Sequence, residues 1–338
     1  MFQKYLVTGA TGFLGRAVLN ALRGKKADIY ALVLEGDPLA SELPREIHTV
    51  CGDVCDSSSL NHFFSFADQK TCVIHCAGIV SVASHPGERL YWVNVGGTNN
   101  VLRHCERRKV GKLIYVSSVH AIPEKRKGVE IAEQAAFSPD LVSGDYAKSK
   151  AIATALVFGA AKEGLNASVV FPSGIIGPGD TAKGSIMSML LSFLSGRLHL
   201  AVKGGYDFVD VRDVASGIVA CAEHGLPGRG YILSGQYATV RDILEAAEKA
   251  IDIRRVVFYL PIGLAKAVSA AHEKWSIRNQ RPLYFTPYAV AVLGSNVRFS
   301  RKEAAAALNY TPRPLQNSVR DTILWLENHQ RKRRTPHT

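Results

Sequence analysis

The chain has 338 residues, of which 47% are hydrophobic and 21% charged, and its formal net charge at pH 7 is +12. This composition predicts a folded globular protein of about two domains and excludes a largely disordered, collagen-like or coiled-coil chain. No apolar run approaches the roughly 18 residues that a membrane-spanning helix needs, and no signal-peptide pattern precedes the first predicted strand. We therefore expect a soluble, cytoplasmic protein.

The first half of the chain alternates short β-rich runs with helical stretches. We predict strands at residues 5–7, 29–34, 47–50, 72–75, 113–116 and 167–171, and helices at residues 12–23, 57–66, 90–107 and 146–162. Strands that alternate with helices in this way predict an α/β fold, in which helices cover both faces of a parallel sheet.

The second half loses this alternation and predicts helices near residues 185–195, 211–224, 239–251, 262–278 and 317–329, with only short strands. A Gly- and Pro-rich border at 174–184 divides the chain into residues 1–175 and 176–330, followed by a basic tail at 331–338. We expect the second part to return some elements to the first. Asp210 and Asp213 have the spacing of a helix N-cap and its reciprocal acid, so we assign them to capping rather than to catalysis.

The six cysteines do not have the spacing of a zinc site. Two pairs, Cys51/Cys55 and Cys72/Cys76, are four residues apart, whereas zinc ribbons use pairs separated by two residues. We expect reduced, buried thiols and no metal. The basic clusters lack the interleaved aromatic residues that stack on bases. We therefore expect a small-molecule partner, and neither nucleic acid nor a membrane.

Three glycines, Gly9, Gly12 and Gly15, lie between the first predicted strand and the first predicted helix. Glycine permits a tight turn and lets a pyrophosphate approach the main chain, and the N-terminus of the following helix offers N–H groups to phosphate oxygens. A phosphate cradle at the N-terminal end of the chain is the function that this arrangement predicts.

The run TGATGFLG, from Thr8 to Gly15, closely resembles the dinucleotide motif of the extended short-chain dehydrogenase/reductase family. That family includes NAD-dependent epimerases, dehydratases and dihydroflavonol-reductase-like enzymes. The resemblance continues over roughly residues 4–235, through the segments GDV at 52–54, HCAG at 75–78, NVGGTNNV at 94–101, YVSS at 115–118, YAKSK at 146–150 and FVDVRDVA at 208–215. It implies a Rossmann-type doubly wound parallel sheet, a smaller and mostly helical C-terminal part that binds substrate, and a homodimer formed through the helices at 90–107 and 146–162.

The resemblance also implies a set of cofactor-binding residues, most of which follow successive strands. They are Gly9, Thr11, Gly12, Phe13, Leu14, Gly15, Glu35, Asp53, Val54, Ala77, Gly78, Asn94, Tyr146, Lys150 and Pro172. Asp53 would meet the adenine, and Pro172 belongs to the strand end that wraps the nicotinamide amide in relatives.

The end of the second strand decides between NAD(H) and NADP(H), because an acid there accepts hydrogen bonds from a ribose 2′-OH and an arginine binds a 2′-phosphate. Glu35 lies near this position and residues 31–37 contain no arginine, which favours NAD(H). Arg16, directly after the third glycine, faces either a phosphate or solvent and keeps NADP(H) open. Glu35 as a solvated loop acid is the alternative.

Tyr146 and Lys150 are four residues apart at the start of a predicted helix, so both side chains project from one face. A neighbouring ammonium lowers the pKa of a phenol from near 10 toward the range useful for acid/base catalysis. The resemblance makes Tyr146 the proton donor, Lys150 the residue that holds the nicotinamide ribose, and Ser118, rather than Ser117, the hydroxyl that orients the carbonyl. It also implies that Asn94 supports Lys150 through a water.

His120 either lines the substrate pocket and relays a proton or is a hydrogen-bonded loop histidine. Dehydration is disfavoured, because dehydratases of this family place an acidic pair after the strand-end hydroxyl, where this chain has Val119 and His120. The segments at 204–215 and 229–235 look most like the dihydroflavonol-reductase-like branch. We therefore expect reversible hydride transfer between a nicotinamide and a ketone, aldehyde or secondary alcohol.

Two alternatives stay open. A nucleotide-sugar epimerase would use Arg278, Arg281 or Arg298 to bind a diphosphate, although no pattern singles these arginines out. A non-catalytic NAD(P)-binding regulator is disfavoured because the chain keeps both Tyr146 and Lys150. Apolar stretches in the second half favour an organic carbonyl that is partly apolar, although any helical core needs such stretches.

Overall fold

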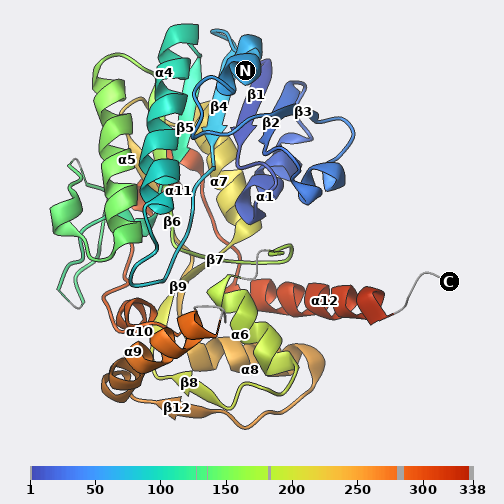
Figure 1. Ribbon diagram of the computed structural model, residues 1–338, viewed down its shortest axis with the longest axis vertical. Helices are drawn as coiled ribbons and strands as arrows, with labels where there is room; N and C mark the ends of the chain where they lie inside the picture. The colour runs from blue at the N-terminus through green and yellow to red at the C-terminus, as the bar shows by residue number, and fades with distance from the viewer. Residues whose placement is uncertain (1, 127, 135, 182–183, 280–284, 335–338) are drawn as a thin grey trace.

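The computed structural model of the protein describes residues 2–126, 128–134, 136–181, 184–279 and 285–334 (Figure 1). Its centre is a seven-stranded sheet in the order β10-β6-β5-β4-β1-β2-β3, and every pairing in it is parallel. The strands are β1 (Lys4–Thr8), β2 (Asp28–Val33), β3 (His48–Cys51), β4 (Thr71–His75), β5 (Lys112–Val116), β6 (Ala167–Pro172) and β10 (Gly230–Leu233). The first six begin and end within about one residue of the predicted bounds, because buried parallel strands read as short β-branched runs.

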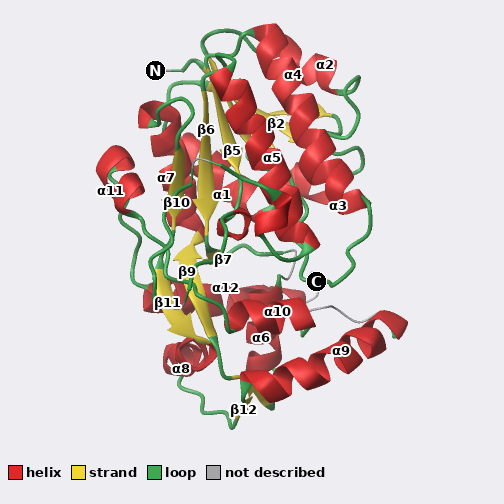
Figure 2. Cartoon of the chain, turned by 90° about the vertical axis from the view of Figure 1, so that its left-hand side faces the viewer, coloured by secondary structure: helices red, strands yellow, loops and turns green. Residues whose placement is uncertain are grey.

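Helices cover both faces of this sheet, as the alternation predicted (Figures 1 and 2). On one face α1 (Phe13–Leu22) packs on α7 (Val211–His224), and on the other α4 (Thr98–Arg108) packs on α5 (Asp145–Lys162). The sheet separates two apolar cores, one around Val18 and Ile218 and the other around Leu102 and Ala151. This confirms the Rossmann-type fold. Because α7 and β10 come from residues 211–233, the chain leaves the sheet after β6 and later returns to it.

The remaining elements form a smaller part below the sheet in Figure 1. It contains a three-stranded sheet of β7 (Gly174–Ile176), β9 (Gly205–Asp210) and β11 (Gln236–Thr239), and a pair of β8 (Leu200–Val202) with β12 (Phe258–Leu260). The helices there are α6 (Ser185–Leu194), α8 (Val240–Ile251), α9 (Ile262–Arg278), α10 (Pro287–Leu293) and α12 (Leu315–Arg334). Helix α12 extends through residue 334, so the first residues of the predicted basic tail continue a helix; residues 335–338 lie outside the described residues.

Two helices of the first half differ from their predicted form. The helix predicted at 57–66 is a short α2 (Leu60–Phe63) followed by the 3₁₀ turn η2 (Phe64–Phe66). The helix predicted at 90–107 begins as α3 (Arg89–Tyr91), widens into the π-helical segment η3 (Trp92–Gly97) and then continues as α4. Such π-helical segments are common at functional sites, and this one carries Asn94. Two further helices, α10 and α11 (Lys302–Leu308), have only seven residues each, too few for a periodic pattern to predict.

Two smaller expectations need correction. Asp210 caps α7 as predicted, because its carboxylate accepts a hydrogen bond from the Arg212 N–H at 2.8 Å. Asp213 does not cap back; its carboxylate accepts from the backbone N–H and the guanidinium of Arg313 at 2.7–2.9 Å. The capping pattern could not predict a partner 100 residues away.

The six cysteines are all free thiols. Cys72, Cys105 and Cys221 are buried, but Cys51 and Cys55 are exposed, contrary to the expectation of uniform burial. Both exposed residues lie at or just beyond the end of β3, which is the edge strand of the sheet. Across the described part of the chain, no helix combines the length and the apolar character needed to cross a bilayer.

Candidate active site

Most of the sequence-predicted cofactor residues lie along one edge of the sheet. They follow the carboxyl ends of β1, β2, β3, β4 and β6, and Ser118 follows β5. The strand order reverses between β1 and β4, which lie side by side at the centre of the sheet. Ligands of doubly wound sheets bind outside the carboxyl ends of the strands at such a switch point. The fold therefore brings residues that are up to 163 positions apart in the sequence, Gly9 and Pro172, to one edge of the sheet.

The glycine turn after β1 leaves no room for side chains. Gly9 has φ of +65°, and a Cβ on it would lie 2.6 Å from the Ala77 backbone nitrogen. A Cβ on Gly15 would lie 2.0 Å from the Gly9 carbonyl oxygen, so the first turn of α1 packs directly on the loop. Helix α1 starts at Phe13 with Gly12 as its N-cap, and its first N–H groups have no side-chain cap. This cradle fits a pyrophosphate, because such N–H groups and the positive end of the helix bind anions.

His75 fixes the loops around the cradle and was not singled out in the sequence as more than part of a motif. Its Nδ1 lies 2.7 Å from the Thr8 hydroxyl, and its Nε2 lies 3.0 Å from the Thr98 hydroxyl. The Thr8 hydroxyl also accepts from the Ala77 N–H, and the Thr98 hydroxyl donates to the Asn94 carbonyl. Burial lowers the pKa of His75 to about 3, with a smaller contribution from Lys150, so the imidazole is neutral at pH 7. The network ties β1, β4 and the π-helical segment into one unit.

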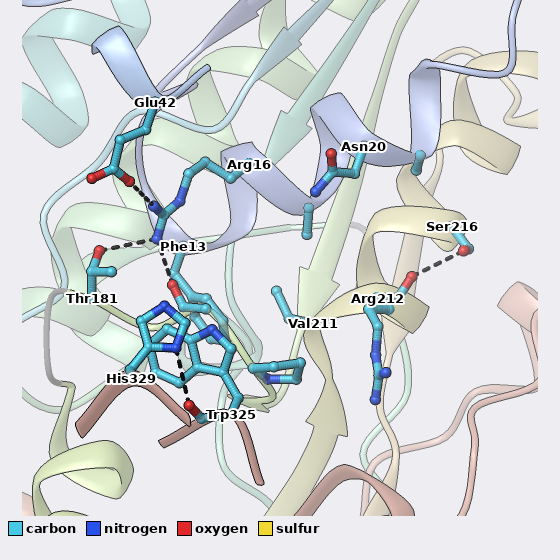
Figure 3. A pocket seen from close by; sticks show the side chains of 14 residues that line it. Phe13, Arg16, Asn20, Glu42, Thr181, Val211, Arg212, Ser216, Trp325 and His329 are labelled. Atoms are coloured by element: carbon cyan, nitrogen blue, oxygen red, sulfur yellow. Dashed lines mark hydrogen bonds and ion pairs between the residues drawn. The ribbon is translucent and has the colours of Figure 1, made fainter. Parts of the chain in front are cut away.

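Arg16 neither points freely into solvent nor stays free for a phosphate. Its guanidinium donates to the Gly179 carbonyl at 2.5 Å and to the Thr181 hydroxyl at 3.0 Å, and it pairs with Glu42 at 3.4 Å (Figure 3). These contacts lie in a cavity of about 560 Å³ between α1, α7, α12 and the loop at 178–181. Arg16 thus binds the loop that follows β7 to the first turn of α1, with three of its five N–H donors engaged.

The loops after β2 and β3 carry Glu35, Asp53 and Val54, the residues predicted to contact the adenosine half of the cofactor. Glu35 is exposed in the turn after β2. The Asp53 carboxylate accepts from the Cys55 N–H at 2.8 Å, which forms a tight turn, and its own N–H donates to the Ser59 hydroxyl. Val54 is buried against Gly97, where a Cβ would approach its side chain to 2.7 Å. The π-helical segment therefore packs directly on the loop after β3.

Asn94 organises the loop after β4. Its Oδ1 accepts from the Ile79 N–H at 2.7 Å, and its Nδ2 donates to the Ile79 carbonyl and the Ser149 hydroxyl at 3.0 Å. A Cβ on Gly78 would lie 3.1 Å from Asn94 Oδ1 and 3.3 Å from Lys150 Nζ. Asn94 and Lys150 thus converge on Gly78. The direct hydrogen bonds of Asn94 go to Ile79 and Ser149, so its water-mediated support of Lys150 stays a prediction.

Ser118, Tyr146 and Lys150 come together at the end of β5. The Ser118 hydroxyl accepts from the His120 N–H at 3.3 Å and hydrogen-bonds with the Tyr146 phenol. Lys150 Nζ donates to the Val116 carbonyl at 2.9 Å and lies 5.0 Å from the centre of the Tyr115 ring. Ser117 points the other way, because its hydroxyl lies 2.6 Å from that of Thr154 in α5.

Burial dominates the protonation of the two titratable groups. It raises the pKa of Tyr146 to about 12, and the hydrogen bond with Ser118 partly offsets this. It lowers the pKa of Lys150 to about 8, with a small opposing effect of Cys76. The expectation that the Lys150 ammonium lowers the Tyr146 pKa is not met, because desolvation outweighs any attraction from Lys150, whose ammonium is directed to Val116 and Tyr115. The phenol is therefore protonated at neutral pH.

His120 is held by two tyrosines from the C-terminal half. Its Nε2 lies 3.1 Å from the Tyr206 hydroxyl and its Nδ1 lies 3.1 Å from the Tyr288 hydroxyl. The His120 and Tyr146 rings are 5.7 Å apart with a T-shaped geometry. Burial lowers the pKa of His120 to about 4, so the ring is neutral and one tyrosine donates to it while the other accepts. Sequence reasoning assigned no role to either tyrosine: Tyr206 lies in the segment 204–215 but was not singled out there, and Tyr288 belongs to no motif.

The candidate anion-binding arginines do not gather at this site. Arg278 and Arg298 are exposed, and Arg281 lies outside the described residues. The ring that packs on Tyr146 is that of His120, which in turn contacts the rings of Tyr206 and Tyr288.

The residues at this edge suit a dinucleotide. A pyrophosphate has a cradle that side chains would fill, and Tyr146 and Lys150 lie at the same edge of the sheet, beyond Gly78. When bound, a nicotinamide cofactor would supply hydride chemistry; the glycine turn, Asn94 and Lys150 are the residues that would hold it.

Comparisons with known proteins agree with this geometry. Residues 5–234 match the model of the NAD dependent epimerase/dehydratase family. The chain is 26% identical to sterol demethylase protein B of Methylococcus capsulatus, over 95% of this chain and 97% of that protein. It is also 26% identical to a putative dihydroflavonol 4-reductase of Synechocystis, over 96% and 95% of the two chains. The crystal structure of gox2253 superposes with a TM-score of 0.84 and 28% identity, over 97% and 99% of the two chains. With a family model that matches more than half of its residues, the chain belongs to the NAD-dependent epimerase/dehydratase family of enzymes.

Proposed function

We propose that this protein is an oxidoreductase that reversibly interconverts a secondary alcohol and a ketone, with nicotinamide as hydride carrier. The observation that carries the proposal is the convergence of Ser118, Tyr146 and Lys150 at the end of β5, at the same edge of the sheet as the glycine turn. A dehydrogenase needs a positioned proton donor next to the carbon that accepts hydride, and this arrangement supplies one.

In the reduction, the Ser118 hydroxyl orients the carbonyl oxygen by a hydrogen bond, and the Tyr146 phenol transfers its proton to that oxygen. The hydride that the carbonyl carbon receives is the cofactor's contribution. Lys150, one helical turn from Tyr146, holds the cofactor. In the oxidation the same phenolate takes the proton back, so one group serves both directions.

The proposed substrate is a large, mainly apolar alcohol or ketone. Tyr206 and Tyr288 bracket His120 next to Tyr146, which gives the site an aromatic wall with few fixed charges. The name of the similar Methylococcus protein refers to a sterol, which supports a polycyclic or isoprenoid substrate for this chain too. The epimerase alternative would need a diphosphate grip that the exposed Arg278 and Arg298 do not build.

A panel of candidate substrates tests the proposal. Purified protein with NAD⁺ is given sterols, long-chain secondary alcohols and nucleotide-diphosphate sugars, and NADH formation is followed by absorbance. We expect turnover of one or more apolar alcohols and none of the sugars. Interconversion of a nucleotide sugar without net NADH formation would instead favour the epimerase, and cofactor binding without turnover of any class would favour a regulator.

We also propose that NAD(H) is the preferred cofactor. Glu35 is exposed at the end of β2, and Arg16 is held by Glu42, Gly179 and Thr181 instead of being free for a 2′-phosphate. Titration by fluorescence is expected to give a lower Kd for NADH than for NADPH. Glu35→Arg should shift the ratio of the two Kd values toward NADPH by about tenfold or more, because it exchanges a repulsive charge for an attractive one. Glu46→Arg, in a different loop, is the control, and tighter NADPH binding by the unmodified protein would contradict the proposal.

A further inference from the structure

Large apolar side chains are exposed at one end of the molecule, on α9 and the strands next to it. Of the 15 large hydrophobic residues that are exposed in the described part of the chain, seven lie there, so the exposure is concentrated rather than scattered. They are Leu200, Val256, Phe258, Leu264, Val268, Trp275 and Ile277. Figures 1 and 2 place α9 and β12 together at the lower margin, on the far side of the smaller part from the seven-stranded sheet.

Helix α9 is inverted relative to an ordinary surface helix, which buries its apolar stripe and exposes its polar face. Its buried positions include the polar residues Ser269, Glu273 and Ser276. Its exposed face carries Leu264, Val268 and Trp275, which follow one another at helical spacing and so form one stripe. Trp275, the largest side chain of the three, is 54% exposed. We call the stripe Leu264, Val268 and Trp275 the α9 stripe.

Within the segment that carries the α9 stripe most exposed charges are positive, although Asp242 and Glu245 of α8 lie near Tyr259 in β12. Between Asp252 and Arg278 the exposed basic residues are Arg254, Arg255, Lys266, Lys274 and Arg278, whereas Asp252 is the one exposed acid. The other acid of this stretch, Glu273, faces inward, where its carboxylate accepts from the N–H and hydroxyl of Ser84 at 2.7 Å. An apolar stripe with Trp and Leu, flanked by Lys and Arg, is the pattern of a helix that lies in a membrane interface.

The α9 stripe is also close to the wall of the active site. The inner face of α9 contacts α10 and holds the loop at 82–84 through Glu273. Thr286, the N-cap of α10, donates to the Val82 carbonyl, and Tyr288 in α10 reaches His120 beside Tyr146. One layer of structure thus separates the outer surface of α9 from the substrate side of the site.

We propose that α9 docks the protein on the surface of anionic bilayers, with the α9 stripe at headgroup level and Lys274 and Arg278 on lipid phosphates. A bilayer suits this face better than a second copy of the chain, because a symmetric pair would bring the same basic residues together. This departs from our expectation of no membrane partner, which considered only spanning segments. The inference does not depend on the proposed reaction, since it rests on exposed groups outside the catalytic machinery.

Vesicle co-sedimentation tests the proposal on the full-length protein. We expect sedimentation with vesicles of phosphatidylcholine and phosphatidylserine, much less with pure phosphatidylcholine, and weakening as salt is raised. The triple variant Leu264→Ser/Val268→Ser/Trp275→Ser should lower the partition coefficient by about tenfold or more. The control Leu141→Ser/Leu226→Ser changes exposed leucines elsewhere and should bind like the unmodified chain. Unchanged NADH affinity and melting temperature would show that the triple variant is folded.

Tryptophan fluorescence gives a second measurement. Trp275 and Trp92 are both exposed, but only Trp275 lies on α9. Anionic vesicles should shift the emission to the blue; Trp275→Phe should remove this shift and Trp92→Phe should keep it. Equal vesicle binding by the triple variant and the unmodified protein would overturn the proposal. Sedimentation velocity without lipid gives the other contradicting result. If the unmodified protein and the control variant form a dimer and the triple variant does not, the stripe is a self-association surface and the proposal is wrong.

Discussion

Tyr146→Phe is expected to lower kcat for alcohol oxidation and ketone reduction by about 10²- to 10⁴-fold, the usual contribution of a positioned proton donor. The phenol is buried and hydrogen-bonds with Ser118, so removal of its oxygen deletes the donor without opening a cavity. Steady-state kinetics with the alcohol or ketone identified by the substrate panel measure the loss. NADH affinity should change little, because the glycine turn and Lys150 remain.

The pH dependence separates proton transfer from a merely structural role. Burial raises the pKa of Tyr146 to about 12. At any pH below this value, the fraction of Tyr146 present as phenolate therefore increases about tenfold for each unit by which the pH rises. Oxidation needs the phenolate, so kcat/KM for the alcohol should rise from pH 6 to pH 9 in the unmodified enzyme, whereas reduction uses the neutral phenol and should not rise. Tyr115→Phe, another buried phenol near Lys150, is a comparison variant and should keep most of the activity. Full activity of Tyr146→Phe would remove the catalytic assignment.

Gly15→Ala is expected to weaken dinucleotide binding and to destabilise the fold. The new Cβ would lie 2.0 Å from the Gly9 carbonyl oxygen and 2.9 Å from the Ala10 Cα, both of them backbone atoms that cannot rotate away. The first turn of α1 must therefore move off the loop, at a cost of about 3 kcal/mol in the free energy of unfolding. Because the displaced turn misdirects N–H groups whose bonds to a charged phosphate contribute about 1.5–3 kcal/mol each, Kd for NADH should rise at least about tenfold.

Gly159→Ala is the matched control, because Gly159 lies within α5 and a Cβ there would meet no atom within 4 Å. Alanine favours a helix over glycine, so this variant should raise the free energy of unfolding by about 0.5–1 kcal/mol and leave Kd for NADH unchanged. Urea unfolding and fluorescence titration measure both variants. Normal NADH binding by Gly15→Ala would show that the cradle does not hold the pyrophosphate.

Local sequence patterns were sufficient to predict the first six strands of the sheet. Each strand from β1 to β6 is a short apolar run, and the residues at their ends follow recognisable motifs, so the glycine turn, Ser118, Tyr146 and Lys150 could be placed at one edge of the sheet in advance. The protonation of Tyr146 could not be predicted, because it depends on how much of the chain buries the phenol. The spacing of Tyr146 and Lys150 predicts that the two side chains share a helix face. It does not predict how deeply the phenol is buried, and burial dominates the pKa of Tyr146.

By itself, the sequence determined the order of strands and helices in the first half, the glycine cradle and the pair on α5, because these depend on neighbours within a few residues. Only the tertiary structure decided the partners that come from far along the chain. Tyr206 and Tyr288 hydrogen-bond with His120 from 86 and 168 residues away. Arg313 pairs with Asp213, which therefore does not cap α7 as expected. Arg16 binds the loop at 178–181. The inverted face of α9 belongs to the same group, because a periodic pattern gives the spacing of apolar residues but not which side of the helix meets the protein.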